Sequence, residues 1–188
     1  MDWRKTSKWD LPTEVEINGH IHPFRSDFRA ILDIIEVMTD LTIDEQDRGF
    51  YSLAIFYEDF DEMPVTDFAE SAQYMHWFIN GGEEQSKKQS QKLMDWKQDF
   101  PIIVAPINRV LGFESRGADY LHWWTFLSAY MEIGECLFSQ VVSIRKKLAK
   151  GKKLDKPDKE FYMRNKELVD FKIEETPEEE DFFDQWIT

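Results

Sequence analysis

The side chains of this sequence best suited to metal binding or acid–base chemistry are its four histidines and its single cysteine. His20 and His22 are two residues apart, so they project from the same face of a β-strand, and with a third ligand they could bind zinc. The chain contains no CxxC or HExxH pattern, and no further side chain has metal-ligand spacing with this pair. We therefore expect two surface imidazoles on a hairpin and no metal site.

The other histidines and the cysteine stand in aromatic or apolar helical segments. No nucleophile pattern accompanies His76 or His122, so each is expected to be a hydrogen-bonded histidine of the core or its boundary. Arg145 is several helical turns from Cys136, too far to activate its thiol, and we expect Cys136 to lie in the core. The chain also lacks GxGxxG, GKS/T and GxSxG sequences. We predict no catalytic residue, no cofactor and no enzymatic activity.

The net charge of −14 limits the partners that the protein can bind. Phosphate binding needs a positive surface, so DNA, RNA and anionic membranes are not expected partners. No apolar run reaches the ~18 residues needed to cross a bilayer. The charge is uneven, because residues 145–159 hold eight Lys/Arg and two Asp whereas residues 174–184 hold seven Asp/Glu and no cation. This asymmetry suggests that one segment pairs with the other, within a chain or between chains.

Two segments are candidates for binding a partner. The basic run, residues 145–159, could bind phosphates, form a solvated helix end and loop, or dock an acidic segment. Three aromatic residues of the acidic C-terminal region are spaced i, i+1, i+4, which could place them on one face of a short helix, although the region could also be a solubilising tail. Docking of this tail on the basic run of a neighbour would give a head-to-tail homo-oligomer. The residues of this hypothesis are Arg145, Lys146, Lys147, Lys150, Phe182, Phe183 and Trp186.

Hydrophobic periodicity predicts a mainly α fold with an N-terminal β-hairpin over residues 13–24. Val15, Ile17 and Ile21 alternate with polar residues, as expected of strands with one buried face. The Asn18-Gly19 pair between the two runs is favoured in type I′ turns, which need two residues with positive φ. We expect the apolar face of this hairpin to pack on helices.

Helix caps, prolines and glycines predict the helices that follow the hairpin. These are residues 26–39 capped by Ser26, 42–57 opened by a Thr42–Glu45 capping box, a third helix capped by Thr66 and ended by Gly81-Gly82, a fourth starting near 92–95, and a last helix over 157–171. The second helix is expected to bury Phe50, Leu53, Ala54 and Tyr57. Pro101 and Pro106 remove backbone donors from the fourth helix, so we expect a break or kink near one of them.

An aromatic-rich segment, residues 119–150, is expected to form the centre of the core. Asp119 is a predicted N-cap, Gly134 a predicted break between two helices, and Gly151 a predicted helix end. The domain organisation that follows is a mobile N-terminus over residues 1–10, a single helical domain over 11–172 and a disordered acidic tail over 173–188.

Four segments carry a resemblance to a known family: LPTEVEINGHIHPFRSDFRAILDIIEVM, SLAIFYEDF, YMHWFINGG and DYLHWWTFLSAYMEI. They resemble small proteins of long-tailed phages and prophages of Gram-positive bacteria, encoded beside the tape-measure gene. The similarity extends over residues 11–170, and its most specific parts are FRSDFR (Phe24–Arg29) and DYLHWW (Asp119–Trp124). The two prolines of the fourth helix and the length of the acidic tail depart from the family's pattern.

The resemblance implies a tail assembly chaperone. Such a protein binds the long, helical, apolar tape-measure protein, keeps it soluble and helps to recruit tail-tube subunits. It would act in the cytoplasm of the bacterial host, associate with itself, and be absent from the mature virion. Two alternatives stay open: a structural virion protein, such as a tail or head–tail completion subunit, and an acidic DNA mimic that inhibits a host protein.

Overall fold

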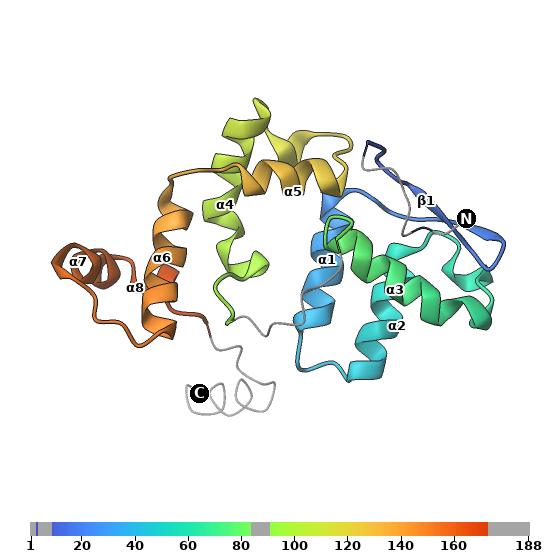
Figure 1. Ribbon diagram of the computed structural model, residues 1–188, viewed down its shortest axis with the longest axis horizontal. Coiled ribbons are helices and arrows are strands. Elements are labelled where there is room, and N and C mark those ends of the chain that lie inside the picture. The colour runs from blue at the N-terminus through green and yellow to red at the C-terminus, as the bar shows by residue number, and fades with distance from the viewer. Residues whose placement is uncertain (1–2, 4–8, 84–90, 173–188) are drawn as a thin grey trace, which may run out of the picture. The chain divides into compact units, whose positions relative to one another are not determined.

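The computed structural model describes residue 3 and residues 9–83 and 91–172. This part of the chain forms eight α-helices and one two-stranded antiparallel sheet, which comes first in the sequence (Figure 1). The predicted mainly α fold with an N-terminal hairpin is confirmed. The predicted mobile N-terminus falls largely outside the described residues, and the predicted acidic tail falls entirely outside them.

The described residues divide into two compact units. The first takes its described residues from the ranges 1–90 and 101–136, and the second from 91–100 and 137–188. The first residues of helix α4 (Trp96–Leu111) therefore belong to the second unit, and its remaining residues belong to the first. The first unit buries Phe28, Phe56, Phe78 and Phe126, and the second buries Phe138, Val141, Ile144 and Val169. Hydrophobic periodicity identifies the apolar face of each helix, but it does not predict which of these faces pack together. The single helical domain over residues 11–172 stays a prediction.

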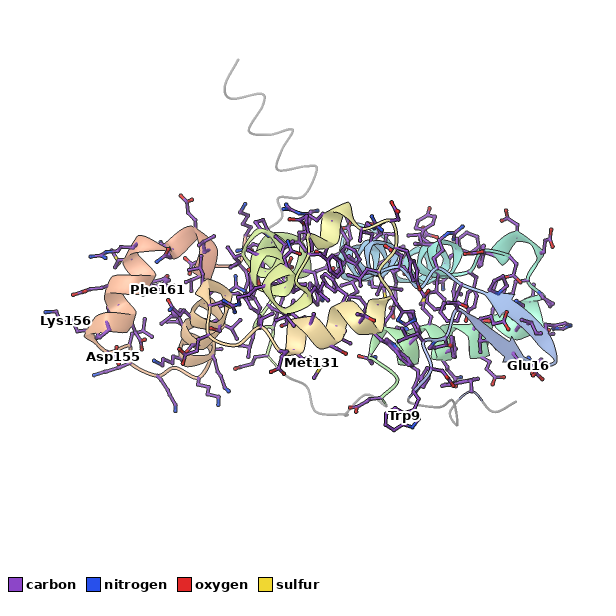
Figure 2. The ribbon with its side chains drawn as sticks, turned by 90° about the horizontal axis from the view of Figure 1, so that it is seen from above. Trp9, Glu16, Met131, Asp155, Lys156 and Phe161 are labelled. Carbon is purple, nitrogen blue, oxygen red and sulfur yellow. The ribbon has the colours of Figure 1, made fainter. Side chains whose placement is uncertain are left out.

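The β-hairpin consists of β1 (Glu14–Ile17) and β2 (His20–Pro23). Asn18 and Gly19 have φ angles of 50° and 87°, the positive values that a type I′ turn requires. The predicted hairpin is therefore confirmed. Glu16, labelled in Figure 2, lies on the exposed face of β1.

The inward face of the hairpin differs from the predicted one. The two-residue turn sets Ile17 opposite His20 and Val15 opposite His22, so these four side chains share a face. Ile21 points to the other face and is 62% exposed, so its predicted inward position is wrong. Because side chains alternate along a strand, the register across the turn decides which residues of β2 are buried.

Three helices and two short 3-10 turns follow the hairpin: α1 (Phe28–Thr39), α2 (Glu45–Phe56), the turns Phe60–Glu62 and Val65–Asp67, and α3 (Phe68–Ile79). Asp27 caps α1 in place of Ser26, and Asp44 caps α2 in place of Thr42. Each carboxylate accepts the N–H of the residue two positions on, at 3.0 and 2.9 Å. A charged acceptor makes a stronger hydrogen bond than a hydroxyl, which explains why the aspartates take the cap positions.

The predicted end of α3 is confirmed, whereas its predicted cap and the predicted burial of Phe50 on α2 are wrong. Helix α3 begins after Asp67 and has no cap from Thr66, whose hydroxyl instead donates to the Asp67 carboxylate at 3.1 Å. Gly81 and Gly82 have φ angles of 72° and 82° and follow the last residue of α3, as predicted. Phe50 was predicted to be buried but is 51% exposed.

Helix α4 is continuous from Trp96 to Leu111, so of the predicted break or kink near Pro101 or Pro106 the break does not occur. The helix starts with a reciprocal cap. The Asp95 carboxylate accepts the N–H of Gln98 at 2.9 Å, and the Asp99 carboxylate accepts the N–H of Asp95 at 2.9 Å. These bonds satisfy free N–H groups at the helix start.

Four helices complete the chain: α5 (Trp123–Met131), α6 (Leu137–Ala149), α7 (Lys156–Arg164) and α8 (Lys166–Val169). Gly134 and Gly151 have φ angles of 64° and 63° and follow α5 and α6, so both predicted helix ends are confirmed. The N-cap of α5 is His122 and not Asp119. The predicted last helix over residues 157–171 is divided at Asn165 and ends at Val169.

The two segments that carry the most specific family resemblance meet inside the first unit. Backbone N–H groups of Phe28 and Trp123 donate to the carbonyls of Leu121 and Ser26 at 2.9 and 2.7 Å. The Asp27 carboxylate, besides capping α1, accepts the N–H of Leu121 at 2.9 Å. These contacts fix the start of α5 against the start of α1.

Candidate functional site

Arg145, the first residue of the predicted partner-binding set, is buried in the second unit. Its guanidinium makes a bidentate ion pair with the Asp99 carboxylate at 2.6 and 2.9 Å, and Asp99 is itself buried. It also donates to the carbonyls of Leu168 and Val169 at 2.7 Å each, and lies 4.1 Å from the centre of the Phe171 ring. Because Arg145 is only 4% exposed, it is not available to a partner and serves as a structural residue.

The lysines of the same set have different surroundings. Lys146 and Lys150 are exposed on α6 and at its end. Lys147 makes an ion pair with Asp158 of α7, and this hydrogen bond raises the pKa of Lys147. Part of the basic run is therefore paired within its own unit. Phe182, Phe183 and Trp186 lie outside the described residues, so docking of the tail on Lys146 and Lys150 stays a prediction.

The histidines of the hairpin lie in a cluster with two aspartates. His22 was predicted to be at the surface, but it is 2% exposed. Its Nε2 lies 3.2 Å from Oδ2 of Asp67, and its Nδ1 lies 2.7 Å from Oδ2 of Asp59. Nδ1 of His20 lies 2.7 Å from the same Oδ2 of Asp67, and the His20 side chain is partly exposed. Asp59 and Asp67 were missed because they are about 40 residues away in the sequence, and only the register of the hairpin could have shown that both histidines point inward.

Asp67 is fully buried and yet remains a carboxylate. Asn18 and the two histidines hydrogen-bond to it, and so does Thr66. The hydrogen bond from Asn18 is the largest cause that holds its pKa well below the usual range, and it outweighs burial, which would raise the pKa. A buried anion with this many donors is held in a fixed position.

Of the two remaining histidines and the cysteine, His122 is buried as predicted, whereas His76 and Cys136 lie outside the core. His122 is buried, as predicted: its Nδ1 accepts the N–H of Trp124 at 3.1 Å and its Nε2 donates to the carbonyl of Pro12 at 3.1 Å. Burial lowers its pKa. His76 is exposed on α3 and Cys136 is half-buried, so neither lies in the core.

Four aromatic side chains form a continuous row on the first unit, which we call the aromatic row: Tyr51, Phe50, Phe60 and Phe68. Successive rings are 6.1, 5.0 and 5.4 Å apart between centroids. Phe50 and Tyr51 are exposed, and Phe60 and Phe68 are half-buried. The rings come from α2, the following 3-10 turn and the start of α3, so the sequence pattern of any single helix does not reveal them.

The surface of the second unit also carries a depression. A depression of about 370 Å³ in the second unit is lined by Lys166, Glu167, Asp170, Phe171 and Lys172. In the described part of the chain, none of the helices combines the length and the apolar character that crossing a bilayer demands.

A family model described as Bacteriophage Gp15 protein matches residues 9–171, a range that contains every helix and strand of the described residues. No curated protein and no solved structure matches the chain.

Proposed function

Since the chain belongs to the Bacteriophage Gp15 protein family, we propose that it is a phage tail assembly chaperone that binds the tape-measure protein. The proposed role is to keep the tape-measure protein soluble and to help recruit tail-tube subunits. The observation that carries this proposal is the family match over residues 9–171. The role itself follows from the resemblance to proteins encoded beside the tape-measure gene.

The aromatic row is the proposed contact surface for the tape-measure protein. Phe50 and Tyr51 leave much of their ring area in water, and aromatic side chains dominate the binding energy of most protein interfaces. A long, apolar helix could pack its i, i+3, i+4 and i+7 side chains against such rings. Because the rings already contact one another, little side-chain freedom would be lost on binding.

The charge of the chain suits a protein that covers an apolar partner. A net charge of −14 would make complexes repel one another, which keeps them in solution while the tape-measure protein is still uncovered. In this proposal the protein acts by binding alone, without a catalytic step or a cofactor. It works in the cytoplasm of the bacterial host and is left out of the mature virion.

Co-expression with the tape-measure protein of the same phage tests the proposal. The wild-type chain should raise the soluble fraction of the tape-measure protein, and the double variant F50S/Y51S should lose much of this effect because it removes two exposed rings. M163S is the control, since Met163 is an exposed apolar residue on α7 of the other unit. A tape-measure protein that stays insoluble with the wild-type chain would contradict the proposed function. Equal activity of F50S/Y51S and wild type would reject the aromatic row as its surface.

A further inference from the structure

Three metal-binding side chains converge where the hairpin meets the segment before α3. Nδ1 of His20, Nε2 of His22 and a carboxylate oxygen of Asp67 all lie within 4.8 Å of one another. Both imidazole nitrogens point at the same oxygen, Oδ2 of Asp67, at 2.7 and 3.2 Å. Two imidazoles and one carboxylate are a common set of protein ligands for zinc.

His22 lies between two carboxylates. Its Nε2 faces Asp67 and its Nδ1 faces Asp59, and a neutral imidazole carries a single N–H. A metal ion between Nε2 and Asp67 would accept an electron pair from each of these two groups, and the single N–H would remain on Nδ1 for Asp59.

The surroundings of the three ligands are those of a metal site. Nδ1 of His22 is left to donate to Oδ2 of Asp59 at 2.7 Å, the carboxylate–histidine arrangement that fixes the ligand nitrogen of many metal-bound histidines. Asn18 and Thr66 donate to Oδ1 of Asp67 at 2.9 and 3.1 Å. Oδ2 of Asp67 is thereby the oxygen left to face the imidazoles. Oδ1 of Asp59 is buried and has no hydrogen-bond partner among the described residues.

We propose that His20, His22 and Asp67 bind a divalent transition-metal ion, with zinc as the ion that this ligand set favours. Zinc–ligand bonds of about 2.0–2.2 Å place tetrahedral ligands about 3.3 Å apart. The separation of 3.2 Å between His22 and Asp67 already fits, whereas His20 must withdraw slightly from its 2.7 Å contact. The His20 side chain is 55% exposed, so solvent and not packed protein lies on its outer side. Because one side of His20 faces solvent, a water molecule would occupy the fourth coordination position of the metal.

The site would fasten the hairpin to the helical part of the first unit. His20 and His22 belong to β2, and Asp67 is the residue before α3, so the metal joins two segments that are about 45 residues apart in the sequence. A ligand that binds the folded state and not the unfolded chain stabilises the fold in proportion to the logarithm of its concentration. The proposed metal is therefore a structural one, and its binding is separate from contact with the tape-measure protein.

Titration of the full untagged chain with zinc chloride, after treatment with a chelator, tests the site. Isothermal titration calorimetry should give one equivalent of bound zinc, and the melting temperature should rise with zinc concentration. H20A is the main variant because His20 is the most exposed of the three ligands; it should weaken zinc binding at least tenfold. H76A removes another exposed histidine, one outside the cluster, and should bind zinc like wild type.

Two further measurements separate a built site from adventitious binding. D59N should weaken zinc binding by about 10–100-fold, the usual effect of removing a group that supports a metal-bound histidine. Cobalt in place of zinc should give the visible absorption of a four-coordinate ion in wild type and not in D67N. Absence of zinc binding to the wild-type chain, or equal binding by wild type and H20A, would overturn the proposal.

Discussion

The burial of Arg145 follows from its place on the helix and not from its neighbours in the sequence. It stands in a run of cations at the end of α6, which suggests a solvated side chain. Yet Phe138, Val141 and Arg145 are spaced i, i+3, i+7, the spacing of one helix face, and all are buried. Helical spacing could have identified Arg145 as an inward residue, whereas its carboxylate partner Asp99 on α4 could not have been identified from the sequence.

Removing the charge of Arg145 should destabilise the protein strongly. R145M leaves the buried Asp99 carboxylate without its bidentate partner, and breaking a buried ion pair in this way costs about 3–5 kcal/mol. Urea denaturation of R145M and of the control K146M, which changes an exposed lysine, measures the difference. Equal stability of the two variants would show that the ion pair does not hold the second unit together.

His122 should make the stability of the protein depend on pH. Its pKa is lowered by burial from the ordinary value of 6.5, so the unfolded chain takes up a proton more readily than the folded one. The free energy of unfolding should therefore fall as the pH drops below 6.5. Asp27, which pairs with His122 in a backbone bridge, stays ionised in this range: burial raises its pKa, but hydrogen bonds from Arg29 and Leu121 outweigh burial and lower it.

The variant H122N isolates this contribution. An asparagine can still cap α5 but does not titrate. The slope of unfolding free energy against pH should be smaller in H122N than in wild type between pH 5 and pH 7, a window set by the ordinary histidine pKa of about 6.5. Identical slopes would mean that His122 is not the source.

At the scale of elements, the hairpin and the helix ends marked by glycine could be predicted, whereas the N-caps and the contacts between elements could not. Asn18-Gly19 predicted the turn, and Gly134 and Gly151 predicted helix ends, because each is a local backbone requirement. The pairing of the Asp27 region with the Leu121 region joins residues 94 apart, and no local pattern encodes it. The cluster of His20, His22 and Asp67 was missed for the same reason, since Asp67 is 45 residues from His22.

The junction between α1 and α5 depends on Asp27. Its carboxylate caps α1 and also accepts the N–H of Leu121, so D27A removes a cap and leaves a backbone donor unsatisfied. The expected loss is about 1–3 kcal/mol, whereas D27N, which can still cap the helix and accept a hydrogen bond, should lose less. Thermal unfolding followed by circular dichroism ranks the variants. A D27A protein as stable as D27N would refute the role of the junction.

At the scale of the whole molecule, the uneven charge should govern self-association. The sequence predicts that the acidic C-terminal segment docks on the basic run of a neighbour, and Lys146 and Lys150 remain exposed for such a contact. Deleting residues 174–188 should then shift the size-exclusion profile, most strongly at low salt, because added salt screens exposed charges. The double variant K146E/K150E should cause the same shift. An unchanged profile at every salt concentration would exclude this mode of association.

We propose that the protein assists assembly by binding and does not become part of the phage particle. Quantitative mass spectrometry of infected-cell lysate and of purified virions distinguishes these two fates. The protein should be abundant in the lysate, co-purify there with the tape-measure protein, and be missing from virions. A fixed number of copies in every purified virion would refute this proposal and identify the protein as a structural subunit.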